Sequence, residues 1–202
     1  MTGATAAPAS TSVERPSAPM PGAFPPAARQ PIPVNEYLPA TIVTMRRLRE
    51  HGSAMEPRVR QIADYLLGRT SAAEVDPAAL GGRLLPHVFV LAIERMRAEL
   101  RLRILLAGTA LDTAFGQPLK ARCIEDFMHG PHGASVIQGF HDCAKHGTPL
   151  WMRQVVSIGG RMPRFVEGVV VHLPEDRIYG GLVVGEIAEA PPGGSFERRA
   201  LR

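Results

Sequence analysis

Histidine and cysteine side chains gather in one short stretch of the chain, where they could in principle hold a metal ion. The stretch contains His129, His132, His141, Cys143 and His146. A zinc site needs about four such ligands converging on one point. His129 and His132 fit neither a helix face nor a recognised zinc-finger spacing, and His141 and Cys143, two residues apart, diverge on a helix. We therefore expect no metal site.

Motifs of catalysis are also missing from the sequence. Gly159-Gly160-Arg161 and Gly180-Gly181 lack the strand, loop and helix context of a phosphate-binding loop. No serine or cysteine lies in a nucleophile-elbow pattern. We expect a protein that is not an enzyme.

One segment shows how the chain changes from strand to helix. Leu102 to Ala107 reads as a strand that stops at Gly108, whose free backbone suits the turn. Thr109 can cap the next helix together with Asp112, three residues on. Gly116 can end that helix in the left-handed conformation.

The order of the other elements predicts the fold class. Apolar runs and alternating residues predict two early strands, and a helical pattern with a common apolar face predicts a long helix after them. Three more strands follow, joined by short turns. The predicted elements are strands at Leu84–Ile93 and Leu100–Ile104, short irregular helices within Gly116–Met128, a helix at Ala134–His146, and strands at Leu150–Ser157, Arg164–His172 and Arg177–Ile187. In one sheet, this order gives an α+β domain with five antiparallel strands and its helices on one face.

The residues before this domain divide into a tail and a helical part. Residues 1–33 are rich in Pro, Ala, Ser and Thr, so we expect a disordered tail that folding does not need. Residues 34–82 are expected to form N-terminal helices. One would follow Pro39 within Asn35–Gly52, with Ile42, Met45 and Leu48 as its apolar positions. The domain itself is placed at residues 83–188, with a flexible basic tail at 189–202.

A second N-terminal helix, Pro57–Leu67, carries a clear apolar stripe. Pro57 suits its first turn and Gly68 its end. The stripe consists of Val59, Ile62, Ala63, Leu66 and Leu67. Such a stripe is too apolar to remain in water. We expect it to pair with a second copy in a homodimer, with folding back onto its own sheet as the alternative.

Composition narrows the class of protein. With 202 residues, 45% of them hydrophobic, the chain suits one ordinary globular domain with appendages. The longest apolar runs are too short to cross a membrane, and no secretory signal is evident, so we expect a cytoplasmic protein with Cys123 and Cys143 reduced. The net charge of +4 comes from scattered arginines without aromatic interleaving, which leaves a nucleic-acid-associated regulator as a minor alternative.

Several short motifs resemble those of PAS domains, and of the bacterial PAS_5 family in particular, from about Val59 to Ile187. They are the helix before the domain, Val75-Asp76-Pro77, Leu85-Pro86-His87 before the first strand, Ala107-Gly108-Thr109 after the second, and Gly116 followed by Leu119. Ala121 departs from this pattern, because glycine is common there. The aromatic content of 5% is also low for a pocket that stacks a flat cofactor.

The resemblance implies a PAS fold and a regulatory role in signal transduction. PAS domains bind small molecules between the helical crossover and the sheet, pair with themselves or with other signalling domains, and transmit changes through flanking helices. The resemblance places nine ligand-binding residues around such a cavity, namely Phe115, Phe127, Val136, Phe140, His141, Trp151, Arg153, Phe165 and Leu182. We expect a largely filled core, Trp151 buried, and His87, His141 and Arg153 as the candidate polar anchors.

The same resemblance implies two alternatives that use a cofactor. In haem-binding PAS domains a histidine of the long helix is the ligand, which here indicates His141. In flavin photoreceptors a cysteine of the helical region reacts with the flavin, and Cys123 lies there, although its surroundings lack their Asn-Cys-Arg-Phe-Leu-Gln pattern. Our leading expectation is a sensor or adaptor that uses no cofactor and acts on a separate protein.

Overall fold

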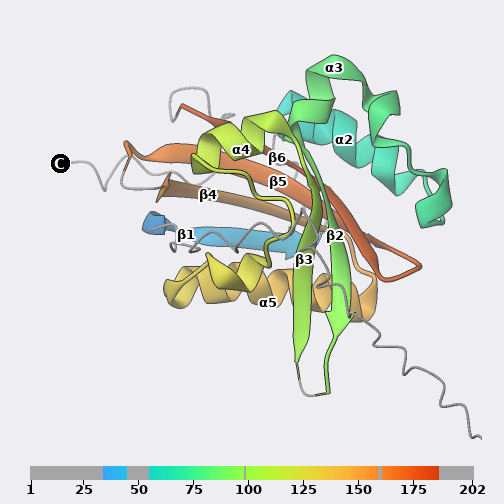
Figure 1. Ribbon diagram of the computed structural model, residues 1–202. Coiled ribbons are helices and arrows are strands. Elements are labelled where there is room, and N and C mark those ends of the chain that lie inside the picture. Colours follow the sequence, from blue (N-terminus) through green and yellow to red (C-terminus); the bar gives the residue numbers. More distant parts are fainter. Residues whose placement is uncertain (1–33, 45–54, 98, 159–160, 187–202) are drawn as a thin grey trace, which may run out of the picture. The chain divides into compact units, whose positions relative to one another are not determined.

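The computed structural model describes residues 34–44, 55–97, 99–158 and 161–186. They form an α+β domain around one antiparallel sheet of six strands in the order β1-β4-β5-β6-β2-β3 (Figure 1). The strands are β1 (Val34–Thr44), β2 (Val88–Arg95), β3 (Leu100–Ala107), β4 (Leu150–Ile158), β5 (Arg164–Leu173) and β6 (Arg177–Gly185). The α+β class and five of these strands confirm the prediction.

The helices are short apart from one. They are α2 (Pro57–Leu67), α3 (Gly81–Leu84), α4 (Thr109–Phe115) and α5 (Gly130–His146), with 3-10 turns at Ala72–Glu74, Pro77–Leu80, Leu85–His87 and Ile124–Asp126. The chain passes from β3 to β4 through α4, the last 3-10 turn and α5. None of the helices in the described ranges is long and apolar enough to cross a membrane.

The sheet is covered on both faces, so the domain has two apolar cores. On one face, side chains of the sheet pack with those of α4 and α5, and Phe89, Val136 and Phe140 belong to this core. On the other face they pack with α2, and Ile62 and Trp151 belong to that second core. We had expected helices on one face only; the second layer explains why β4 and β5 are buried almost throughout.

The segment from Val34 to Thr44 corrects a prediction. It forms β1, an edge strand paired with β4, and not the start of a helix after Pro39. The register between β1 and β4 shifts between Leu38 and Thr41. Proline is tolerated at such irregularities and on edge strands, where no ladder hydrogen bond is lost. Residues 45–54, which include Met45 and Leu48, lie outside the described ranges, as do the predicted tails at 1–33 and 189–202.

The strand-to-helix turn forms where we predicted it, with a different cap. The N-cap of α4 is Gly108, and Thr109 is the first helical residue without a side-chain capping bond. The side chain of Asp112 instead accepts a 2.9 Å hydrogen bond from the backbone N–H of Leu119. Gly116 ends α4 with a φ of 72°, in the left-handed region as predicted.

The apolar stripe of α2 lies against the sheet of its own chain. Val59, Ile62, Ala63 and Leu66 are at most 1% exposed and belong to the second core, while Leu67 is partly buried. Pro57 begins the helix and Gly68 ends it, as predicted. A dimer interface through this stripe was the wrong expectation, because β5 and β6 already cover it.

Candidate functional site

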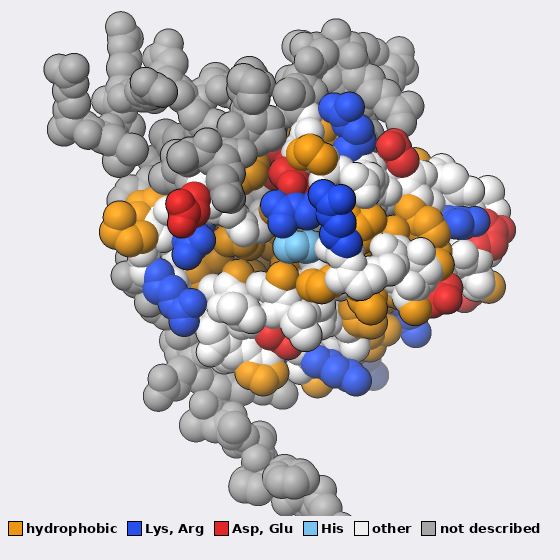
Figure 2. Space-filling model, turned by 90° about the horizontal axis from the view of Figure 1, so that it is seen from above, with side chains coloured by type: hydrophobic (Ala, Val, Ile, Leu, Met, Phe, Trp, Pro, Cys, Tyr) orange, Lys and Arg blue, Asp and Glu red, His pale blue; other side chains and the backbone are white. Residues whose placement is uncertain are grey.

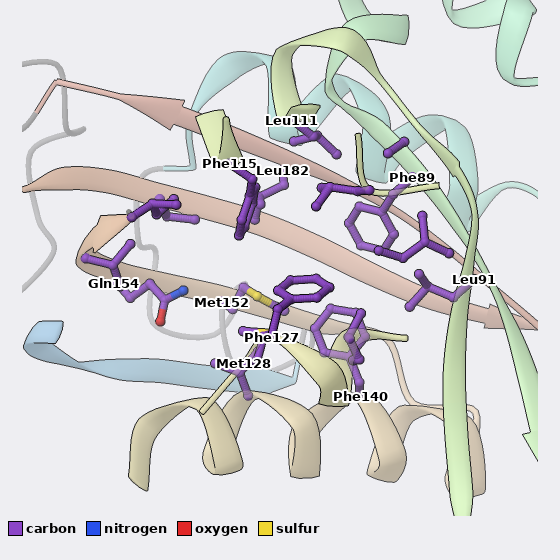
Figure 3. A pocket seen from close by; sticks show the side chains of 18 residues that line it. Phe89, Leu91, Leu111, Phe115, Phe127, Met128, Phe140, Met152, Gln154 and Leu182 are labelled. Atoms are coloured by element: carbon purple, nitrogen blue, oxygen red, sulfur yellow. The ribbon is translucent and has the colours of Figure 1, made fainter. Parts of the chain in front are cut away.

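A small cavity lies between the sheet and the connection from β3 to β4. Its volume is about 80 Å³. Side chains from the five strands β2 to β6 line it on the sheet side, and side chains from α4, the turn at Ile124–Asp126 and α5 line it on the other (Figure 3). The cavity therefore lies on the face where the resemblance implied a ligand site.

Aromatic rings make up much of the cavity wall. The ring centroids of Phe89 and Phe140 are 6.0 Å apart, and those of Phe115 and Phe127 are 5.7 Å apart in an edge-to-face arrangement at 73°. Such pairs stabilise their mutual orientation beyond simple burial. Phe115 is the last residue of α4, so the left-handed turn at Gly116 fixes where the chain leaves this wall.

The structure divides the predicted ligand-binding residues into two groups. Phe115, Phe127, Val136, Phe140 and Leu182 line the cavity. The other four do not line it, which corrects the prediction. Three of them lie on the opposite face of the sheet, namely Trp151, Arg153 and Phe165. The fourth, His141, lies outside the cavity wall. The pleat explains the first three, because neighbouring residues of a strand point to opposite faces.

Gln154 is the polar residue among the cavity-lining residues that sequence reasoning missed. It lies on β4, two residues after Met152, so both side chains point to the cavity face. The side chain is 7% exposed, and its Oε1 has no hydrogen-bond partner in the described part of the chain. Figure 3 shows its amide at one end of the group of lining side chains. The alternation Met152, Gln154, Val156 was the available signal.

The opposite face of β4 carries a buried ionic network. The Glu167 carboxylate is fully buried and accepts hydrogen bonds from Arg153 Nε (2.9 Å) and Nη2 (2.7 Å) and from Trp151 Nε1 (2.9 Å). The Arg153 guanidinium also lies 4.8 Å from the centroid of the Trp151 ring. Arg153 is therefore held by a carboxylate and an aromatic face, which satisfies the charge that burial would otherwise penalise.

This network continues into the start of α2. Glu167 Oε1 also accepts a 2.8 Å hydrogen bond from the backbone N–H of Glu56. The Glu56 side chain caps α2 by accepting hydrogen bonds from the backbone N–H groups of Arg58 (2.7 Å) and Val59 (2.9 Å). The N-terminus of α2 is thus fixed to the centre of the sheet through buried carboxylates.

The two thiols lie in unreactive surroundings. Cys143 is fully buried in α5, and burial raises the pKa of its thiol to about 11. Burial also raises the pKa of Cys123, against the opposing effect of Arg101 and Arg103. A thiolate is the reactive form of cysteine, so these surroundings disfavour nucleophilic chemistry at either residue.

The histidines considered as candidate haem or metal ligands have other partners. His141 Nε2 lies 3.2 Å from Glu125 Oε1 in an ion pair or hydrogen bond, and does not line the cavity. His146 Nδ1 lies 3.1 Å from the backbone oxygen of Asp142. Among the described residues, no three His, Cys, Asp or Glu side chains are grouped so that they could hold a metal ion.

Charges of both signs are mixed on the surface. Arg95 pairs with Asp176 at 3.0 Å. Two further pairs join arginines of β3 to neighbouring carboxylates, namely Arg101 with Asp126 and Arg103 with Glu94. Figure 2 shows acidic, basic and apolar side chains interspersed on the face seen from above. A nucleic-acid-binding surface usually carries a continuous patch of basic side chains. This view therefore offers no support for the nucleic-acid alternative.

Comparison with protein families, curated proteins and solved structures found no match for this chain. The resemblance to PAS domains therefore stays a prediction.

Proposed function

We propose that this chain is a non-enzymatic sensor or adaptor of the PAS type, which acts in signal transduction by binding a partner protein or a second copy of itself. The supporting observation is the small apolar cavity that lies between a helical crossover and the sheet. It lies in an arrangement of two strands, crossover and three-stranded meander. Its volume of about 80 Å³ favours a small ligand over haem or flavin, since pockets for drug-sized molecules start at about 300 Å³.

The proposal includes a route from the cavity to the surface. β4 presents Met152 and Gln154 to the cavity and Trp151 and Arg153 to the other face. Glu167 holds the latter pair and also the backbone at the start of α2. A ligand that displaces β4 by a small distance would therefore change how α2 is held. This helix is the output element of the proposed sensor.

Hydrogen exchange tests this function directly. Small molecules released from the denatured protein would be identified by untargeted mass spectrometry and added back to ligand-free protein. We expect exchange to change in α2 as well as in the cavity wall. In Trp151→Phe, which removes one hydrogen bond to Glu167, the response of the cavity wall should persist and that of α2 should weaken. A ligand response confined to the cavity wall would contradict the proposed function.

A further inference from the structure

The side chains that line the cavity offer a ligand no oxygen atom that could accept a hydrogen bond. Of the 18 residues in the lining, all but Gln154 are apolar. The amide oxygen of Gln154 is buried, with almost no surface of its own. Figure 3 shows the amide nitrogen, and not this oxygen, turned toward the other lining side chains. The methionine sulfurs of Met128 and Met152 are the remaining acceptors of the lining, and thioether sulfur accepts hydrogen bonds only weakly.

We infer that the cavity takes a small, uncharged molecule that carries no hydrogen-bond donor, such as a short hydrocarbon or ether. A hydroxyl or amino group buried among these side chains would lose its hydrogen bonds to water and gain no strong acceptor. The unpaired donor would then cost the full free energy of its desolvation. This inference rests on the proposed function and names the chemical class of molecule that would be sensed.

The same lining disfavours charged ligands and water. It contains no ionisable side chain, so a carboxylate or an ammonium group would lose its hydration without gaining an opposite charge. A buried water makes two to four hydrogen bonds to polar groups, and cavities without such groups stay dry. Here the lining side chains supply one amide group, that of Gln154. An apolar molecule matches this lining better than water does.

The size of the cavity limits the ligand to a few heavy atoms. An apolar cavity of about 150 Å³ admits benzene, which has six heavy atoms. In proportion, the volume of about 80 Å³ holds about three heavy atoms. Unbranched methionine side chains adapt readily to the shape of a ligand, so Met128 and Met152 can adjust the fit.

Dimethyl ether and ethanol form a matched pair of probes for this class. The two molecules are isomers with three heavy atoms each, but ethanol carries an O–H donor and dimethyl ether carries none. Each would be titrated into the full chain while the methionine methyl resonances are followed by NMR. Those of Met128 and Met152, which line the cavity, should shift with dimethyl ether. Those of Met96 and Met162 are the internal control, because both side chains are exposed and lie outside the lining.

The expected difference between the probes follows from the cost of one unpaired donor. A buried donor without a partner costs about 1 to 3 kcal/mol, so dimethyl ether should bind about five- to 150-fold more tightly than ethanol.

Val166→Thr should weaken this preference, because threonine keeps the shape of valine and adds a hydroxyl oxygen to the lining of the cavity. Ethanol could then donate to that oxygen, and we expect the preference for dimethyl ether to fall by about two- to tenfold. Val169→Thr is the matched control on the same strand, since Val169 faces the second core and should leave the preference unchanged. If Val166→Thr fails to fold, Val156→Thr is the second variant, because Val156 also lines the cavity.

Four results would overturn the inference. They are equal affinities for the two isomers, a preference that Val166→Thr and Val169→Thr change equally, no shift of the Met128 and Met152 resonances with dimethyl ether, and larger shifts of these resonances with acetate.

The inference and the proposed function can fail separately. If a donor-bearing molecule released from the protein changes hydrogen exchange in α2, the proposed function survives and the ligand class is wrong. If dimethyl ether binds in the cavity with the expected preference but exchange in α2 stays unchanged, the ligand class survives and the proposed function fails.

Discussion

Trp151 has a polar role as well as an apolar one. It is 4% exposed, as predicted for a buried tryptophan, and its indole N–H is one of the donors that hold Glu167. The burial was predictable, because a lone tryptophan between apolar neighbours on a strand belongs in a core. The hydrogen bond was not, because nothing in the sequence relates Glu167 to this strand.

Trp151→Phe should therefore be more destabilising than the lost apolar surface suggests. Phenylalanine fills most of the volume but offers no donor, so Glu167 Oε1 loses one hydrogen bond and retains that from the N–H of Glu56. We expect the free energy of unfolding to fall by about 1 to 3 kcal/mol, measured by urea denaturation. An unchanged midpoint would show that the indole N–H contributes nothing net.

Two histidines should make stability depend on pH. The pKa of His87 is lowered by burial and then by Arg58, and the pKa of His172 is lowered chiefly by burial. The unfolded chain therefore takes up protons first as the pH falls through about 6.5. The stability present above this pH is lost as the pH falls toward the lower pKa values of the folded state.

The measurement is the melting temperature between pH 7.5 and 5.5. It should fall with pH in the wild type and fall less steeply in His87→Gln combined with His172→Gln. The slope is the readout, because the substitutions also change the absolute stability. Equal slopes in the two proteins would show that other groups cause the pH dependence.

At the scale of elements, the turn into α4 depends on the absence of a side chain at Gly108. A Cβ there would lie 2.2 Å from the backbone oxygen of Pro86, and the Gly108 N–H donates a 2.8 Å hydrogen bond to the oxygen of Val88. The first turn of the crossover is thus packed directly on the backbone that leads into β2.

Gly108→Ala should be destabilising by about 3 kcal/mol or more, because backbone and not a flexible side chain must move. Gly82→Ala is the matched control, since a Cβ at Gly82 meets nothing within 4 Å. The control should change the free energy of unfolding by less than about 1 kcal/mol, toward stabilisation. Similar losses in both variants, measured by thermal unfolding, would contradict the packing argument.

Because α2 is buried against its own sheet, charged substitutions in its apolar stripe should affect folding, whereas in a helix that pairs between molecules they would affect dimerisation. Ile62→Asp combined with Leu66→Asp forces two carboxylates against β5 and β6, so we expect an unfolded or severely destabilised protein. Gln61→Asp, on the exposed side of the same helix, should have little effect. Circular dichroism and sedimentation of each variant distinguish the cases, and a folded monomeric double variant would restore the intermolecular reading.

The sequence predicted helices and strands well where the spacing of apolar residues agreed with the glycine and proline residues that begin or end elements. Gly116 and Gly68 ended helices as expected, and the meander of β4, β5 and β6 was predictable from apolar runs between turns. β1 was not predictable, because Pro39 and the spacing of Ile42, Met45 and Leu48 favour a helix, and its pairing partner is more than a hundred residues away.

The candidate site was half predictable for a related reason. The crossover residues were assigned to the correct face, but β4 and β5 are buried on both sides, so hydrophobicity alone could not tell which alternate residues face the cavity. Met152 and Gln154 face it, while Trp151 and Arg153 face α2.

For the whole molecule, the position of β1 bears on how the protein behaves in concentrated solution. β4 is buried along its whole length and lies at the edge of the five-stranded part of the sheet, where β1 pairs with its backbone. Deleting residues 1–33 leaves this protection in place and should preserve a monodisperse, folded domain. Deleting residues 1–46 removes β1 and leaves β4, a strand of nine residues, with an unpaired edge, which is a template for the same strand of another molecule. We expect only the longer deletion to form fibrillar aggregates, detected by thioflavin T binding and light scattering. Equal solubility of the two deletion variants would contradict this expectation.

β1 then protects the domain against self-assembly. An edge strand can provide this protection without contacting the ligand or the output helix.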